Sequence, residues 1–348
     1  MSPRSHSNMG RGKTGRVSLA TVAEKSGVST ATASRIINGI NNKASKETVQ
    51  RVKAVVESLG YRPASSGRTL RTQESRIVGL LAASIANPMI AAFASSIEWA
   101  LRAEGYVMAL CDTHEMAEVQ DEYLLEMQSQ LARAIIIIGA VKSPVLDQMQ
   151  TSGPPILFVN RPDPNSTKSP YVGMDNYQAG LDMARCLIAQ GVRKFGVIHG
   201  SLNQTAATFR HSGFMAGLSQ AGVDSANVTQ LTGEGTNPLE VGYACMPSFI
   251  DMQDGPDVIV CTNDILAYGA YRRVIEAGLD PTRDFAFFGF DDNPLNQWIA
   301  PWLNSVGIEE VDIGSTCLSI LKQIWAGNEV EEPAFLPHRI RLNGSGLP

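Results

Sequence analysis

Long hydrophobic runs are missing from this chain of 348 residues. No apolar stretch approaches the roughly 20 residues that a helix needs to span a bilayer, so we expect no membrane-spanning segment. The first residues, MSPRSHSNMGRGKTGR, lack the apolar core of a signal peptide. These absences predict a cytoplasmic protein in which residues 1–16 form a flexible basic tail.

Cysteine is scarce, and its distribution argues against structural sulfur chemistry. The five cysteines are scattered over positions 111, 186, 245, 261 and 317, and no C-x-x-C occurs. An odd, scattered set favours reduced thiols over disulfides or a zinc site. The histidines show no metal-ligand spacing, and G-x-S-x-G, Walker A and G-x-G-x-x-G signatures are absent. The sequence therefore gives no reason to predict an enzyme, a metal or a cofactor.

Acidic residues are scarce at one end of the chain only. Residues 1–72 contain 13 Lys and Arg against 3 Asp and Glu, a net charge of +10. The remaining residues contain 16 basic and 31 acidic side chains, a net charge of −15. A basic segment of this size is what neutralising nucleic-acid phosphates requires, and it predicts salt-dependent affinity. We do not expect the acidic remainder to touch DNA.

The pattern of residues 17–62 predicts three short helices. Ser18 and Ser29 are placed to cap the first two, and Gly27 lies where the turn between them needs a positive φ. The helices are expected over 20–25, 30–38 and 46–59, with inward side chains Val22, Ala23, Ile36, Ile37, Val49, Val52, Val55, Val56 and Leu59. Two helices joined by a glycine turn and braced by a third predict a helix-turn-helix. The alternative is some other small helical domain.

From Arg76 onward, apolar strand-like runs alternate with helical stretches. The strands are expected at 77–83, 106–111, 134–140, 156–160, 171–175, 195–200, 228–232, 258–262, 285–290 and 305–308. The helices are expected at 88–104, 117–132, 177–191, 208–222, 239–253 and 264–277. Apolar strands separated by helices predict parallel sheets covered on both faces, and this many strands favours two doubly wound subdomains.

Polar residues follow these strands at equivalent ends. They are Asn87, Asn160, Arg161, Asp175, Gln204, Asn263, Asp264, Asp291 and Asp292. Ligands of doubly wound sheets bind outside the carboxyl ends of the strands, so a small-molecule site between the two lobes is expected there. For each residue alone, a loop position or a helix N-cap is the alternative. We expect Asp264 to cap the helix at 265–277 and Asp112 to be solvated.

Five motifs in order give the chain a resemblance to the LacI/GalR family of bacterial transcriptional regulators over roughly residues 17–342. They are VSTATASRIIN (28–38), YRPASSGRTLR (61–71), RHSGF (210–214), CTNDILAYGA (261–270) and FFGFDD (287–292). The resemblance implies a basic tail (1–16), an all-α helix-turn-helix domain (17–62), a hinge (63–75) and a periplasmic-binding-protein-like α/β effector domain (76–342). In the effector domain we expect one subdomain over about 76–175 plus 307–335 and the other over about 176–304 plus 336–342.

The resemblance also implies which residues contact DNA. These are Ser18, Leu19, Ser29, Thr30, Ala31, Ser34, Arg35, Asn38, Arg68 and Leu70. Thr30 and Ala31 occupy the positions that set operator preference, and Arg35 can read a guanine edge. The serines are expected to contact phosphates, and Leu70 to wedge into the minor groove. Ala33, Ala64 and Gly67 depart from the family pattern, which predicts looser packing of the recognition helix and a weaker hinge helix.

For the effector, the resemblance implies contacts from the strand ends. These are Asn87, Arg161, Asp175, Gln204, Arg210, Asn263 and Asp291, and we add Trp298 as a ring that can stack on a sugar. Some relatives place aromatic rings at positions that correspond to Met89, Ile90, Arg161 and Gly235 of this chain. The absence of aromatics favours a sugar, polyol or sugar acid over a purine-like ligand.

The predicted function is an effector-controlled DNA-binding repressor that acts as a homodimer, because each chain has one recognition helix for one half-site. The alternative is a solute-binding protein of periplasmic type without a regulatory role. A third class, a small-molecule enzyme, would need a titratable cluster with a nucleophile. The effector's identity, and whether it releases DNA or strengthens binding, stay open.

Overall fold

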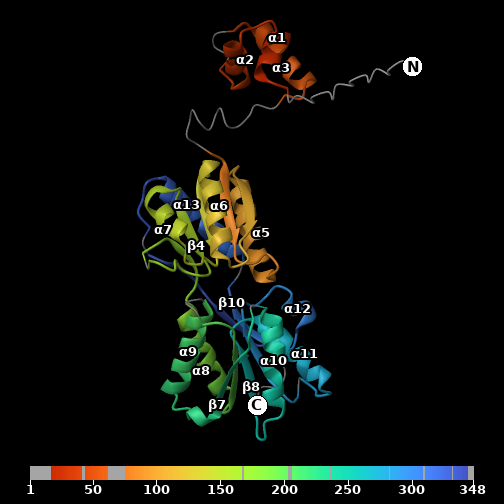
Figure 1. Ribbon diagram of the computed structural model, residues 1–348, viewed down its shortest axis with the longest axis vertical. Coiled ribbons are helices and arrows are strands. Elements are labelled where there is room, and N and C mark those ends of the chain that lie inside the picture. Colours follow the sequence, from red (N-terminus) through yellow and green to blue (C-terminus); the bar gives the residue numbers. More distant parts are fainter. Residues whose placement is uncertain are drawn as a thin grey trace, which may run out of the picture. The chain divides into compact units, whose positions relative to one another are not determined.

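The structure is a computed structural model that describes residues 17–40, 44–61, 75–166, 168–202, 206–235, 237–281, 283–308, 310–330 and 332–343. The chain divides into two compact units, Met1–Glu74 and Ser75–Pro348, which we call the helical unit and the α/β unit (Figure 1). The predicted hinge therefore falls almost entirely outside the described residues, and so does the basic tail.

The helical unit contains the three predicted helices, α1 (Leu19–Lys25), α2 (Thr30–Ile37) and α3 (Lys46–Ser58). Ser18 and Ser29 cap α1 and α2 as predicted, each accepting a backbone N–H at 3.2 Å, and Ser45 caps α3 in the same way. Gly27 has the positive φ of 62° that the turn requires. Val22, Ile36 and Val52 form the buried core that holds the three helices together.

The first lobe of the α/β unit is a six-stranded parallel sheet in the order β11-β5-β4-β3-β1-β2. Its strands are β1 (Ile77–Ala82), β2 (Val107–Asp112), β3 (Ala134–Ile138), β4 (Ile156–Val159), β5 (Tyr171–Met174) and β11 (Ala334–Leu336). Its helices are α5 (Pro88–Ala103), α6 (Ala117–Ser129), α7 (Pro144–Ser152) and α13 (Glu310–Trp325). Alternate side chains of β3 are buried on opposite faces of the sheet. Ile136 packs in the core with α5 and α13, and Ile137 packs in the core with α6 and α7.

The second lobe is a six-stranded sheet in the order β12-β10-β9-β8-β6-β7. Its strands are β6 (Phe195–His199), β7 (Val228–Thr232), β8 (Val258–Cys261), β9 (Ala286–Phe290), β10 (Leu303–Gly307) and β12 (Arg339–Arg341). Its helices are α8 (Asn176–Ala189), α9 (Ala206–Gln220), α10 (Pro238–Ile250), α11 (Asp264–Glu276), the short α12 (Asn296–Ile299) and the 3-10 turn η1 (Ser225–Asn227). The helix pairs α8–α9 and α10–α11 pack against two separate apolar clusters of the sheet.

The prediction of two doubly wound sheets is confirmed, with two corrections. The second sheet is not wholly parallel, because β12 pairs antiparallel with β10. Helices α7 and α13 and the short strands β11 and β12 were not predicted. The chain therefore crosses between the lobes three times: from β5 to α8, from β10 to α13 and from β11 to β12.

Glycines let helices α8 and α9 approach one another closely. A Cβ atom at Gly213 of α9 would lie 2.0 Å from the carbonyl oxygen of Tyr177 in α8. A Cβ atom at Gly180 of α8 would lie 2.2 Å from the carbonyl oxygen of Arg210. Because these neighbours are backbone atoms, they cannot move aside without separating the two helices.

We expect Gly213→Ala to lower the free energy of unfolding by about 1–3 kcal/mol, the usual cost of overpacking. Urea unfolding of the full chain measures this change. Ser212→Ala is the matched control, since Ser212 is an exposed neighbour on the same helix. Equal stability of the two variants would contradict the close approach of α8 and α9.

Candidate nucleic-acid interface and interlobe site

The exposed side of α2 carries most of the predicted base-reading residues. Thr30, Ala31 and Arg35 are exposed, and Ser34 is half-buried. No residue in the described ranges pairs with the Arg35 guanidinium, so its donors remain available to a ligand. Ala33 is fully buried beneath this surface and fixes which side of α2 faces away from the core. This geometry suits a helix that lies in a groove with Arg35 directed outward.

Other predicted DNA contacts are already engaged in the unit's own structure. The hydroxyl oxygens of Ser18 and Ser29 serve as helix caps and also lie 3.0 and 2.9 Å from the threonine hydroxyls three residues later. Asn38, which is exposed, donates from Nδ2 to the Ser34 carbonyl oxygen at 2.7 Å. Leu19 is half-buried at the start of α1. Arg68 and Leu70 lie outside the described residues.

Arg210 of α9 is the centre of the interlobe site. Its side chain is 5% exposed, and its Nη1 atom lies 2.8 Å from Asp291 Oδ1. Nη1 also donates to the Thr262 carbonyl oxygen at 3.0 Å, and Nε donates to Asn176 Oδ1 at 2.8 Å. The guanidinium lies 5.0 Å from the centre of the Phe290 ring. These partners come from the ends of three elements and hold the charge at the lobe boundary.

Asp291 follows β9 in a backbone conformation with a φ of 103°, which non-glycine residues rarely adopt. Burial raises the pKa of its carboxyl, and the Arg210 guanidinium opposes that increase. Opposite charges that neutralise each other make the pair tolerable in a buried place. The sequence thus identified the two residues that the structure brings together.

A cavity beside this ion pair is lined by both lobes. Its walls are Met89, Phe93, Asn160, Met174, Arg210, Asp291, Gly307 and Ile308. Its volume of about 10 Å³ has room for about one water molecule. A sugar-sized molecule therefore enters only if the lobes separate or the side chains move. The first lobe contributes a mainly apolar wall and the second contributes the charged pair.

Among the cavity residues, the strand-end argument had named Asn160, but sequence reasoning missed Phe93, Met174, Gly307 and Ile308. Phe93 lies one helical turn after Met89, so its placement on the same side of α5 followed from helical spacing. Met174 is the last residue of β5, and its apolar side chain excluded it from an argument based on polar strand ends. Ile308 carries no comparable signal.

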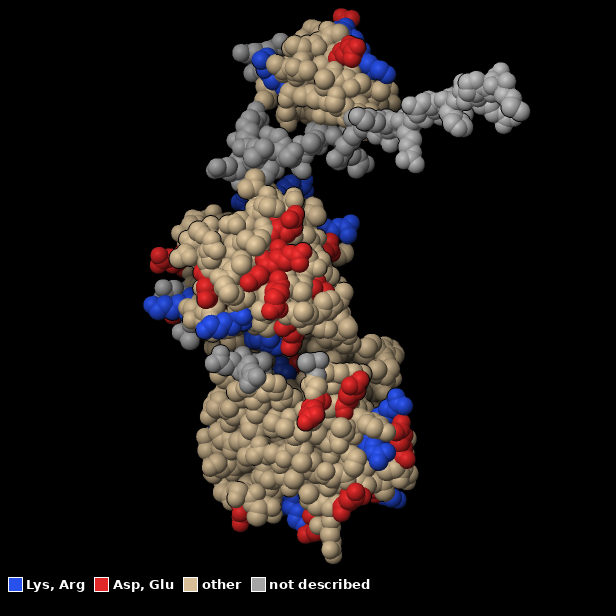
Figure 2. Space-filling model, in the orientation of Figure 1, with Lys and Arg blue, Asp and Glu red and all other residues tan. Residues whose placement is uncertain are grey.

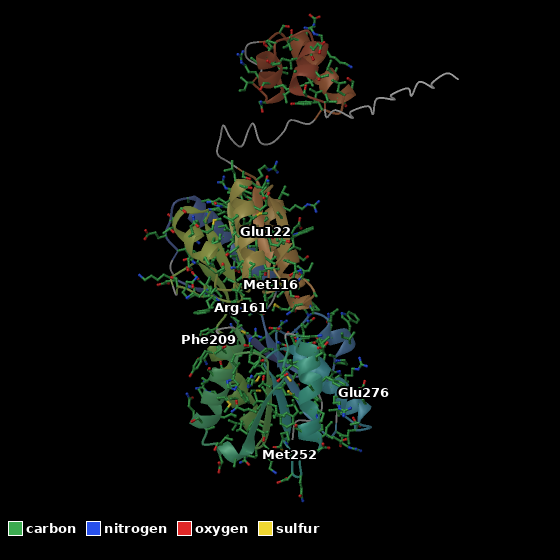
Figure 3. The ribbon with its side chains drawn as sticks, in the orientation of Figure 1. Met116, Glu122, Arg161, Phe209, Met252 and Glu276 are labelled. Carbon is green, nitrogen blue, oxygen red and sulfur yellow. The ribbon has the colours of Figure 1, made fainter. Side chains whose placement is uncertain are left out.

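The remaining predicted effector residues are held by local structure. Asn87, Asp175 and Asn263 are the N-caps of α5, α8 and α11, where their side chains accept backbone N–H groups at 2.9–3.0 Å. Arg161 pairs with Glu115 at 3.0 Å, and Figure 3 shows it at the end of the first lobe that faces Phe209 of the second lobe. Trp298 is 77% exposed and does not line the cavity. Gln204 lies outside the described residues.

One expectation about the aspartates was wrong, and a second holds only in part. Asn263, not Asp264, caps α11, and Asp264 is fully buried. Asp264 instead accepts hydrogen bonds from the Asn293 backbone, the Asn296 amide and the Ser305 hydroxyl. Burial, reinforced by the nearby Asp291 carboxylate, raises the pKa of Asp264 to about 8. Asp112 is only partly solvated: its side chain is 15% exposed, and its carboxylate accepts the backbone N–H groups of Ile85 and His114 at 3.1 Å.

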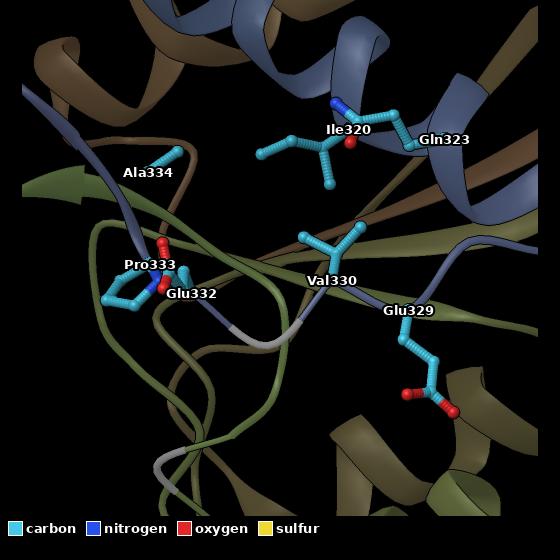
Figure 4. A pocket seen from close by; sticks show the side chains of 7 residues that line it. All are labelled: Ile320, Gln323, Glu329, Val330, Glu332, Pro333 and Ala334. Atoms are coloured by element: carbon cyan, nitrogen blue, oxygen red, sulfur yellow. The ribbon is translucent and has the colours of Figure 1, made fainter.

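A second hollow lies outside the interlobe site. This groove of about 590 Å³ beside α13 is larger than the interlobe cavity, but it is open and contains no predicted site residue (Figure 4). Acidic side chains gather over α6 (Figure 2), which disfavours contact with phosphates there. Within the described ranges, no three His, Cys, Asp or Glu side chains are placed to hold a metal, and no helix is long and apolar enough to cross a membrane. All five cysteines are free.

Comparison with known proteins agrees with this geometry. Residues 18–64 match the profile described as bacterial regulatory proteins of the lacI family, and residues 78–329 match the periplasmic binding protein domain. The HTH-type transcriptional repressor PurR of Mannheimia succiniciproducens is 26% identical over 87% of this chain and 90% of its own length. The lac repressor dimer bound to operator and an anti-inducer has a TM-score of 0.81, with 20% identity over 96% of this chain and all of that chain. A LacI family regulator from Enterococcus faecium with bound ribose has a TM-score of 0.68, with 22% identity over 78% of this chain and all of that one.

Proposed function

Because this chain belongs to the LacI/GalR family of bacterial transcriptional regulators, we propose that it represses transcription as a homodimer whose operator affinity is set by a small effector. The observation that carries this proposal is the coexistence of an unpaired arginine on an exposed helix, in a segment with a net charge of +10, and a buried Arg210–Asp291 pair between two lobes. A solute-binding protein without a regulatory role would have no use for the helical unit. A protein that acts on operator DNA is expected to work in the cytoplasm.

The proposed DNA contacts are the ten residues that the family pattern indicates. Exposure supports Thr30, Ala31 and Arg35 as base readers. Ser18 and Ser29 are exposed at the N-termini of α1 and α2, and helix N-termini are sites where backbone N–H groups can bind phosphates. Selection of tight-binding duplexes from a random pool would identify the operator, and a preference for inverted half-sites is expected.

We expect Arg35→Ala to relax sequence preference at one operator position, at a cost of roughly 1–3 kcal/mol if the contact is bidentate to a base. Affinity for the selected operator and for single-base variants measures this loss. Lys53→Ala is the matched control, because Lys53 is an exposed, positively charged side chain on α3, outside the recognition surface. If Arg35→Ala and Lys53→Ala weaken all duplexes equally, α2 is not the recognition helix.

The proposed effector is a sugar, polyol or sugar acid that contacts Arg210 and Asp291. An ion pair offers both donors and acceptors to hydroxyl groups, and the apolar wall of Met89, Phe93 and Met174 suits the carbon face of a ring. The ribose bound to the Enterococcus faecium relative supports this class. Asn87, Arg161, Asp175, Gln204 and Asn263 are proposed as contacts of an opened cleft. A thermal-shift screen with D-ribose, D-xylulose, D-glucose, cellobiose, D-mannitol and D-gluconate tests the class.

The proposed homodimer is supported by exposed apolar side chains on both lobes. Trp99 of α5 is 73% exposed, and Val107 and Leu110 of the edge strand β2 are 58% and 47% exposed. On the second lobe, Trp298 and Ile299 of α12 are 77% and 62% exposed. Large exposed apolar groups of this kind mark association surfaces, which gives Trp298 a better role than effector stacking. Sedimentation equilibrium of the unmodified chain should therefore give twice the chain mass.

A further inference from the structure

The three crossovers between the lobes converge on two consecutive residues, Asp291 and Asp292. Both have left-handed backbone conformations, with φ values of 103° and 43°. Such conformations cost free energy in non-glycine residues and persist only where the surroundings enforce them. The contacts of this two-residue turn show what enforces them.

The first crossover, from β5 to α8, reaches Asp291 through two side chains. Asn176 is 5% exposed and donates from Nδ2 to the carbonyl oxygen of Met174, the last residue of β5. Its Oδ1 accepts a hydrogen bond from Arg210 Nε at 2.8 Å, and Arg210 pairs with Asp291. Asp291 is therefore joined to the point where the chain leaves the first lobe.

The second crossover, from β10 to α13, lies directly against the turn. The Asp291 N–H donates to the Val306 carbonyl oxygen at 2.7 Å, and the Asp292 N–H donates to Ser305 Oγ at 3.0 Å. A Cβ atom at Gly307 would lie 2.5 Å from the Asp292 Cβ and 2.7 Å from the Asp291 carbonyl oxygen. Glycine is thus required where the chain passes the turn.

The third crossover, from β11 to β12, is joined to the turn by charge. The Asp292 side chain is 5% exposed, and its Oδ2 lies 2.9 Å from Arg341 Nε and 3.4 Å from Arg339 Nη2. Both arginines belong to β12, the first strand after the crossover. Nothing in the proposed effector site uses these arginines, so the cluster has no direct part in ligand contact.

We propose that the Asp291–Asp292 turn couples the effector site to the arrangement of the lobes, and that Asp292 and Arg341 are its positioning residues. A ligand that engages Asp291 changes the forces on one end of the turn. The rigid two-residue backbone passes that change to Asp292, and the Asp292–Arg341 pair transmits it to the third crossover. This inference rests on the proposed effector response, since only a ligand with unequal affinity for two lobe arrangements can shift them.

The first test separates effector affinity from effector response. In the unmodified protein, we expect the tightest-binding compound of the six-compound panel to change operator affinity by about 5- to 150-fold. In Asp292→Asn and in Arg341→Met, that change should shrink to less than about twofold, while the affinity of the protein for the compound stays unchanged. Arg341 is partly exposed near the end of the described chain, so its variant should fold even if Asp292→Asn does not.

Asp284→Asn is the matched control, because it removes a carboxylate from a surface ion pair with Arg283 in the same lobe. An unmodified protein that binds DNA but ignores all six compounds counts against the proposed effector class. An unmodified protein that responds, beside Asp292→Asn and Arg341→Met proteins that respond equally, overturns the coupling role. Loss of compound binding together with the response would show a merely structural role and would also overturn it.

A second test needs no effector. Spin labels at Glu122→Cys on the first lobe and Gln253→Cys on the second report the distance between lobes, with Cys111 and Cys186 replaced by serine. Both labelled positions are exposed. We expect a broader distance distribution in Asp292→Asn and Arg341→Met than in the unmodified protein and in Asp284→Asn. Identical distributions in all four proteins would refute the role of the turn.

Discussion

Asp291→Asn is expected to abolish the effector response while operator affinity without effector remains nearly unchanged. The substitution keeps the shape of the side chain but removes the charge that lies 2.8 Å from Arg210 and borders the interlobe cavity. Loss of a hydrogen bond to a charged group costs about 1.5–3 kcal/mol, so effector binding should weaken roughly 10- to 150-fold. Titration of operator binding, with and without the compound found by the screen, measures both quantities.

Arg210→Ala is a poorer test of the same site. It would leave the Asp291 carboxylate buried without a partner, at a cost of about 3–5 kcal/mol of stability. In Asp291→Asn, by contrast, Arg210 keeps an amide oxygen beside it and its acceptors on Asn176 and Thr262. Glu276→Gln is the matched control for Asp291→Asn. It also replaces a carboxylate by an amide in an ion pair of the same lobe, but Glu276 and its partner Arg272 are exposed. A full response from the Asp291→Asn protein at the original compound concentration would refute the site. Loss of operator binding as well would mean that Asp291 maintains the fold.

The sequence predicted the elements whose pattern is local. Apolar runs located ten strands of the two sheets within a few residues, and the serine caps and Gly27 located the first two helices of the helical unit. Helix α13 was not predicted because no recognised turn or motif separates it from β10 in the sequence. Strands β11 and β12 are three residues each and carry no periodicity that distinguishes them from loops.

The site was predicted only as a set of strand ends, and physical reasons limit that prediction. Position at a strand end does not say whether a side chain caps a helix, as Asn263 does, or is buried in a network, as Asp264 is. That distinction depends on partners such as Ser305, which is 41 residues away in sequence. The pairing of Asp292 with Arg341 has the same origin, since β12 reaches β10 only after the chain has twice crossed the lobe boundary.

The stability of the α/β unit is expected to fall as pH rises from about 4 to about 8, because Asp264 binds its proton more tightly in the folded state. Burial raises its pKa from 3.8 to about 8, so the folded protein retains a proton that the unfolded chain has released. The resulting stabilisation is fully present below the unfolded pKa and is lost as pH rises through the folded value. At about 1.36 kcal/mol for each pKa unit, the total is on the order of 5 kcal/mol.

Urea unfolding at a series of pH values measures this dependence in the full chain. Tryptophan fluorescence reports on the α/β unit alone, since Trp99, Trp298, Trp302 and Trp325 all lie within it. Asp264→Asn removes the titrating group, so its unfolding free energy should vary less between pH 4 and 8 than that of the unmodified protein. At low pH the variant should be the less stable protein, because an amide replaces a protonated acid that has three hydrogen-bond partners. The difference in unfolding free energy between the two proteins should become smaller as pH rises. Parallel pH profiles for the two proteins would show that Asp264 is ionised at neutral pH, held by its three hydrogen-bond donors.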